Sequence, residues 1–247
     1  FVAALVNDTK AYDQIALHLG AIVDIERIVA KIATQKISPR ALVQLAKSLD
    51  EIDQIKIYLS DHSSKVLKER AKGFLEGKPI TSLIQSMLNP EAPVLLSKGE
   101  VIADGVNSEL DELRELLRSG KAHLDKMLER ESERTQIPSL KIAFNNVFGY
   151  YIEVRNTHKD KVPEDWIRKQ TLVNAERYIT EELKEYETKI LGAEDKIKSI
   201  ESRLYMELLI ALQDHIDPLK VNARQVARLD VLWCFAALAI KHNYTRP

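Results

Sequence analysis

Residues 139–179, SLKIAFNNVFGYYIEVRNTHKDKVPEDWIRKQTLVNAERYI, form the one extended stretch of this chain in which apolar and polar residues alternate. Such alternation predicts strands, because successive side chains of a strand point to opposite faces. We expect strands at residues 140–144, 150–155, 166–172 and 176–179. Turns are expected at residues 145–149 and 173–175, and a polar loop at residues 159–165. Four antiparallel strands are enough for a small independent sheet.

Two long segments with heptad spacing flank this stretch, which predicts two helices that pack on each other. The first helix is expected to run to about Arg134, and the second from about Glu181 to Asp217-Pro218. The chain must return to where it left, so the pair is expected to be antiparallel, with the sheet at its tip. The apolar positions are Leu110, Leu113, Leu117, Gly120, Leu124 and Met127 in the first segment, and Leu183, Tyr186, Ile190, Ala193, Ile197, Ile200 and Leu204 in the second.

The rest of the chain predicts further helices. The stripe Ile22, Ile25, Ile28, Val29 and Ile32 predicts a helix, and Asp24 and Glu26 near its start suit a helix N-terminus. Ser38-Pro39 is typical of an N-cap followed by the first helical residue. A small hairpin is expected at residues 94–103, and a last helix at residues 221–240. The predicted fold class is therefore mainly α: several helices, with a long antiparallel helix pair that carries a four-stranded antiparallel sheet at its tip.

Composition narrows the function classes. The formal net charge is −1, so any affinity for nucleic acid must be local. No apolar run is long enough to span a membrane. Residues 1–4 contain neither an initiator Met nor a signal sequence, so we expect a piece of a longer protein. The single cysteine, Cys234, lies in an apolar run, which favours a buried residue in a reducing, intracellular setting.

The predicted sheet is locally basic, with seven Lys and Arg residues against five acids. Its six aromatic residues are best explained as the core of a small sheet. Arg and Lys near amide side chains suit the phosphates of a nucleic-acid backbone, and they equally suit a solvated face. The residues alone leave these two interpretations about even. The polar set comprises Arg168, Lys169, Gln170, Thr171, Asn174 and Arg177.

The segments NNVFGYYIEV (145–154) and VPEDWIRKQTLVNAERYITEELKEYETKILGAE (162–194) resemble the clamp and the returning lever helix of MutS DNA mismatch repair proteins. The resemblance extends to IVDIERIVAKIATQKISPRALVQLAKSL (22–49), GEVIADGVNSELDELREL (99–116), LDVLWCFAALA (229–239) and Asn243-Tyr244-Thr245-Arg246-Pro247, which are similar to the lever of that family. Residues 1–134 are thereby identified as the first part of a lever domain, residues 135–179 as a clamp domain, and residues 180–247 as the second part of the lever.

The resemblance implies a function for these parts. The clamp would contact the backbone of double-stranded DNA without sequence specificity, through Arg168, Lys169, Gln170, Thr171, Asn174 and Arg177. Val173 stands where many members have Lys, so one basic contact is missing here. The lever would couple the clamp to an ATPase domain outside this chain. The full-length protein would bind ATP and Mg²⁺, form a homodimer and engage other repair proteins. It would act in the cytoplasm, on the nucleoid if the protein is bacterial, with no membrane association.

No enzyme activity is expected of this chain itself. It contains no phosphate loop of the type GxxxxGK[ST], no GxSxG motif and no histidine pair at metal-ligand spacing. No catalytic residue, cofactor site or metal site is therefore expected. Phe74-Leu75-Glu76 spells a tripeptide of the mismatch-reading domain, but so loose a match arises by chance. The alternative function is a helical scaffold module whose β tip docks a protein partner, which the heptad stripes alone permit.

Overall fold

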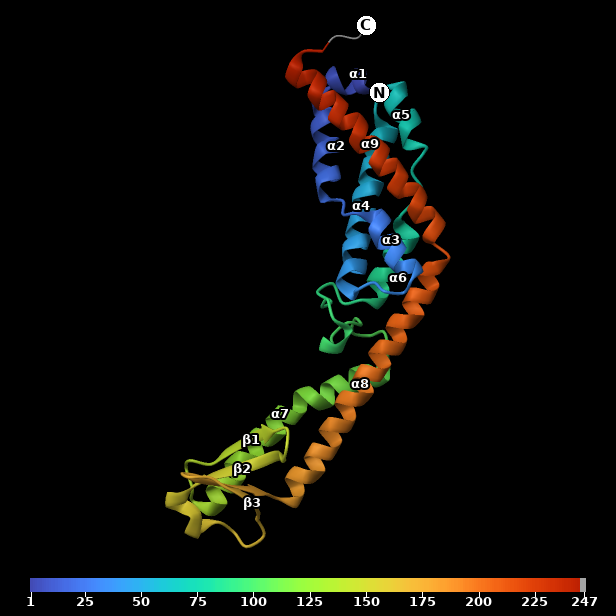
Figure 1. The fold of residues 1–247 in the computed structure, drawn as a ribbon. Coiled ribbons are helices and arrows are strands. Elements are labelled where there is room, and N and C mark those ends of the chain that lie inside the picture. The colour runs from blue at the N-terminus through green and yellow to red at the C-terminus, as the bar shows by residue number, and fades with distance from the viewer. Residues whose placement is uncertain (245–247) are drawn as a thin grey trace. The chain divides into compact units, whose positions relative to one another are not determined.

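The computed structural model describes residues 1–244, apart from the side chain of Lys121. The chain forms two compact units, the first of residues 1–106 with residues 201 onward and the second of residues 107–200 (Figure 1). Within the motif at residues 243–247, Thr245, Arg246 and Pro247 lie outside the described residues. No described helix is both long enough and apolar enough to cross a membrane.

The first unit is helical. Two of its helices begin where the sequence predicts. The side chains of Asp24 and Ser38 cap them by accepting hydrogen bonds from the backbone amides of Arg27 and Ala41. Of the predicted stripe, Ile25, Ile28, Val29 and Ile32 are buried, whereas Ile22 precedes the helix and is only partly buried. The elements are α1 (Val2–Val6), α2 (Thr9–Ala21), α3 (Ile25–Ala33), α4 (Pro39–Asp61), α5 (Lys65–Ala71), α6 (Lys78–Met87), the 3-10 turn η1 (Leu96–Lys98), the end of α8 (Glu181–Gln213) and α9 (Ile216–His242).

Two local expectations in this unit are wrong. Residues 94–103 form no hairpin, because Ile102 pairs with Leu88 and the amide of Ala103 donates to the carbonyl of Met87. Asp217-Pro218 does not end α8. The helix ends at Gln213, and both residues lie in the first turn of α9, where proline is tolerated.

The prediction that Cys234 is buried is also wrong, because the structure shows this residue exposed. In the run from Val231 to Ile240, only Ala236 is fully buried, while Val231 and Phe235 are each at least half exposed. An apolar run shows that a helix can pack on both sides. It does not show which of its faces has a neighbour within the unit.

The second unit contains α7 (Ser108–Thr135), the first part of α8, and the strands β1 (Lys141–Asn145), β2 (Gly149–Arg155), β3 (Ile167–Thr171) and β4 (Ala175–Ile179). A 3-10 turn, η2 (Asn156–Lys161), follows β2. The strand order is β1-β2-β4-β3, and every pairing is antiparallel. All four predicted strands are confirmed. The edge strands are therefore β1 and β3.

One face of the sheet packs against the two helices. Ile152, Val154 and Tyr178 share a buried cluster with Met127 of α7 and Leu183 of α8. The helices run antiparallel, since Arg130 bonds Glu182 while Gly120 lies against Tyr186 and Ile190. A Cβ atom at Gly120 would lie 2.7 Å from the Tyr186 hydroxyl, so glycine permits this close approach. The mainly α fold with a helix pair and a β tip is confirmed.

The element ends lie near the predicted domain boundaries, with α7 ending at Thr135 and α8 beginning at Glu181. The second compact unit also includes helical residues on both sides of the sheet. The division into a lever domain and a clamp domain stays a prediction.

Candidate nucleic-acid interface

Lys169 lies on a bulge in the edge strand β3. Arg168 faces Tyr178 of β4, and Gln170 faces the next residue, Arg177, so Lys169 is the extra residue on its strand. A bulge interrupts the ladder and redirects a side chain. Lys169 is exposed, and no ion pair or side-chain hydrogen bond holds its amine among the described residues. Its ammonium group is therefore available to a ligand.

Arg168 belongs to a row of three bonded side chains. Its guanidinium donates to Glu176 at 3.2 Å, and Glu176 also accepts a short hydrogen bond from the hydroxyl of Tyr178. The bond from Tyr178 and the charge of Arg168 hold the pKa of Glu176 below its usual value. Burial, together with the Glu176 carboxylate, raises the pKa of Tyr178 to about 12. The Arg168 side chain remains 61% exposed, so it can still reach a second anion.

Arg177 lies on the face of the sheet that points away from the helices. Its guanidinium stacks over the ring of Tyr151, 4.3 Å from the centroid. It also donates to Glu153 at 3.3 Å and to Gln170 at 2.9 Å. Its side chain is 19% exposed. These contacts give Arg177 a structural role in the sheet, and whether it also contacts DNA stays a prediction.

The two remaining predicted residues are both exposed: Thr171 ends β3, and Asn174 lies in the turn between β3 and β4. Val173 at its tip is 91% exposed. Asn156 fixes the turn, because its backbone amide donates to Asn174 and its side-chain amide donates to the carbonyl of Val173. The structure therefore places the six predicted residues on β3, on β4 and in the turn that joins them.

Sequence reasoning missed two basic residues beside this turn. Arg155 ends β2 and pairs with Ala175, directly after the turn. Lys159 lies close enough to Glu176 to help lower the pKa of that carboxyl. Both add to the local charge of the predicted sheet, but the pairing of β2 with β4 is needed to place Arg155, and the turn η2 is needed to place Lys159. We call Arg155, Asn156, Lys159, Val173 and Asn174 the basic end of the sheet.

The opposite end of the sheet is joined to α8. The carboxylate of Glu187 accepts a hydrogen bond from the amide of Tyr150 at 3.1 Å. Gly149 has a φ of +76°, and a Cβ atom there would overlap this carboxylate. Val147, in the adjoining turn, is 78% exposed. We call residues 146–150 with Glu187 the anchored end of the sheet.

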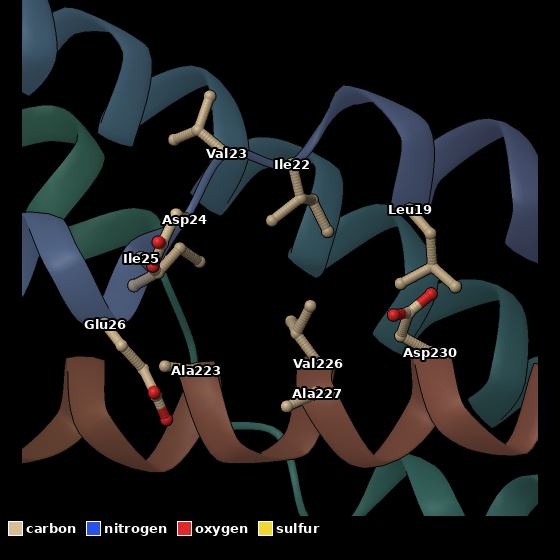
Figure 2. A pocket seen from close by; sticks show the side chains of 10 residues that line it. All are labelled: Leu19, Ile22, Val23, Asp24, Ile25, Glu26, Ala223, Val226, Ala227 and Asp230. Atoms are coloured by element: carbon tan, nitrogen blue, oxygen red, sulfur yellow. The ribbon is translucent and has the colours of Figure 1, made fainter.

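The first unit contains a pocket of about 290 Å³ between the α2–α3 connection and α9. Figure 2 shows the side chains of Ile22 and Val226 pointing toward one another across it. Its charged residues are Asp24, Glu26 and Asp230, all acidic, which disfavours phosphate. Among the described residues, no group of three His, Cys, Asp or Glu side chains could hold a metal ion. The sheet remains the best candidate site.

The chain is similar to known proteins over nearly its whole length. Residues 105–196 match MutS family domain IV, nearly the same residues as the second compact unit. The chain is 56% identical over 97% of its length to the DNA mismatch repair protein MutS of Phocaeicola vulgatus. It is 52% identical over its full length to that of Flavobacterium johnsoniae, and 54% identical over 93% to that of Bacteroides fragilis. The chain covers 27% or 28% of each of these proteins.

Proposed function

Because this chain belongs to the MutS family of DNA mismatch repair proteins, we propose that its sheet holds duplex DNA by the backbone without reading the sequence. The observation that carries the proposal is the exposed amine of Lys169, which the bulge in β3 leaves without a partner among the described residues. Lys, Thr and Asn side chains contact phosphate oxygens without discriminating between bases. Thr171 and Asn174 supply such donors beside it.

The exposed Arg168 and the basic end of the sheet extend this surface. Arg155 and Lys159 add positive charge on the side of the turn opposite β3, so a backbone could be held from two directions. Gln170 and Arg177 hold each other and support the strand pair. Val173 contributes no charge at the tip of the turn, which favours weak binding.

For the longer protein, we propose that the helices couple this DNA contact to an ATPase domain, where ATP and Mg²⁺ bind. The continuous helix α8 supports this role, because it starts directly after β4 and ends among the helices of the first unit. The chain has no phosphate loop, so we assign it no ATP site and no catalytic step. The longer protein would act as a homodimer with other repair proteins, on DNA in the cytoplasm.

The test is duplex binding by this chain at several salt concentrations. Non-specific binding through phosphates is expected to be weak, with a Kd on the order of 10 to 100 µM at physiological salt, and to weaken steeply as salt rises. A duplex with one mismatch and a fully paired duplex should be retained equally. A clear preference for the mismatched duplex would contradict backbone-only contact.

Substitution of Lys169 sharpens the test. Lys169→Ala should weaken binding about 3- to 10-fold and reduce the slope of log affinity against log salt by about 1, because one phosphate contact is lost. Lys241→Ala, at the end of α9, removes the same charge and should have little effect. Charge reversal at Arg168, Lys169 and Arg177 together should abolish binding. Unchanged binding in that variant would favour the scaffold function, with a protein docked on the sheet.

A further inference from the structure

The chain after α5 runs antiparallel along α9. Asn222 of α9 is fully buried and bonds both backbone groups of Leu75, accepting from its amide at 2.8 Å and donating to its carbonyl at 3.2 Å. Two residues earlier, Gly73 passes against Gln225, since a Cβ atom at Gly73 would lie 2.9 Å from the Gln225 side chain. These two contacts fix the backbone of residues 73–75 on the helix.

Arg228 is the next residue in the same stripe of α9. Asn222, Gln225 and Arg228 are spaced three apart, and residues at this spacing lie on one side of a helix. Along the facing segment the order is Leu75, Gly73 and then Arg70, at the end of α5. Arg70 and Arg228 are therefore brought together by the two contacts that precede them.

Arg70 has two donors that no described residue satisfies. Its Nε and Nη2 atoms are buried and have no hydrogen-bond partner. No ion pair involves Arg70 or Arg228 among the residues that the structure describes. Burial, and next the charge of Arg228, lower the pKa of Arg70. Buried charge without a partner is costly, and a nearby like charge adds to that cost.

We propose that Arg70 and Arg228 bind an oxyanion, a carboxylate or a phosphate, between α5 and α9. The planar guanidinium presents parallel N–H donors that match two oxygens of such a group. One anion shared by both side chains would satisfy the buried donors and replace repulsion by two attractions. This site is separate from the sheet and does not depend on the function proposed for the sheet.

The first experiment is thermal unfolding of the whole chain in potassium chloride, potassium phosphate and potassium acetate at matched ionic strength. An anion that binds only the folded chain raises the Tm. Phosphate or acetate should raise the Tm by about 2 °C or more over chloride. A shift with phosphate alone identifies a phosphate site, and a shift with acetate alone identifies a carboxylate site. No shift with either anion would overturn the proposal.

Variants of Arg228, which is exposed, assign the effect to this pair. Arg228→Gln should abolish the anion-dependent shift, while Arg27→Gln, which removes an exposed arginine from α3, should keep it. Arg228→Glu places a carboxylate beside Arg70, so it should raise the Tm in chloride above that of Arg228→Gln and remove the response to anions. Equal anion shifts in the wild-type chain and Arg228→Gln, or a lower Tm for Arg228→Glu than for Arg228→Gln, would refute the site.

Discussion

The anchored end and the basic end of the sheet hold their turns by different means. At the anchored end, Glu187 of α8 accepts from the amide of Tyr150, and Gly149 leaves room for its carboxylate. At the basic end, Asn156, which directly follows β2, bonds the turn at Val173 and Asn174. One end is fixed to the helical framework by an acidic residue. The other presents positive charge to solvent.

The two ends therefore suit different roles, since one attaches the sheet to the helices and the other is exposed to ligands. Phosphate binding needs exposed donors and a positive potential, which an acidic anchor beside the turn would weaken. Rigid attachment needs a buried or close contact with the helices, which leaves no room for a ligand. These two requirements are met at opposite ends of the sheet. Substitutions at the anchored end should therefore change stability, and those at the basic end should change DNA affinity.

The largest effect is expected for Gly149→Ala. The positive φ disfavours any residue with a Cβ atom, and here that atom would also displace the Glu187 carboxylate. We expect the free energy of unfolding to fall by about 3 kcal/mol in urea denaturation. Gly105→Ala is the matched control, because Gly105 has a φ of +84° and a Cβ atom there would meet only open space. Equal losses in the two variants would show that Glu187 contributes nothing to the anchored end.

Glu187→Ala should have a smaller effect, about 1 to 2 kcal/mol, because it leaves the amide of Tyr150 without its acceptor. Hydrogen exchange should accelerate at that amide, while duplex binding should stay unchanged. Glu185→Ala removes an exposed carboxylate of the same helix and serves as the control. Weaker DNA binding by Glu187→Ala would show that the two ends do not act separately.

Much of this architecture could be predicted from local patterns. The heptad positions Leu183, Ile190, Ala193 and Ile197 are all buried, and alternation placed the four strands, because both signals depend only on which residues face a neighbour. Glu187 could not be identified in the same way. It is one of many acidic residues on α8, and its role depends on the close approach of a turn 37 residues earlier in the chain.

The bulge at Lys169 and the exposure of Cys234 escape prediction for a similar reason, since both depend on neighbours distant in the sequence. Alternation treats residues 166–172 as a regular strand, whereas the shift of register appears only when β3 is paired with β4. An apolar run such as Val231 to Ile240 shows only that its residues can be buried. Which of them are buried depends on the elements that pack against each face of the helix. The pattern also gives no sign of the separate bonds that Arg168 and Arg177 make to Glu176, Glu153 and Gln170.

Adding a charge at each turn tests the comparison directly. Val173→Lys at the basic end should raise duplex affinity about 3-fold and increase the salt slope by about 1, because it supplies one more phosphate contact. Val147→Lys makes the same substitution in the other turn, where the residue is also exposed. It should change affinity much less. Equal gains would show that net charge, and not the place of the charge, governs binding.

The smallest effect concerns the pH dependence of Glu176, which lies in β4 beside the basic end. The pKa of Glu176 is lowered by the hydrogen bond from Tyr178 and the charge of Arg168, so the ionised form stabilises the folded chain. This contribution is complete above the unfolded pKa and is lost as pH falls through the folded value. Between about pH 5 and about pH 3, the Tm of the wild-type chain should therefore fall more steeply than that of Glu176→Gln, which cannot ionise. Parallel curves would show that Glu176 is not held by Arg168 and Tyr178 in solution, and Arg168 would then be as free as Lys169 to bind phosphate.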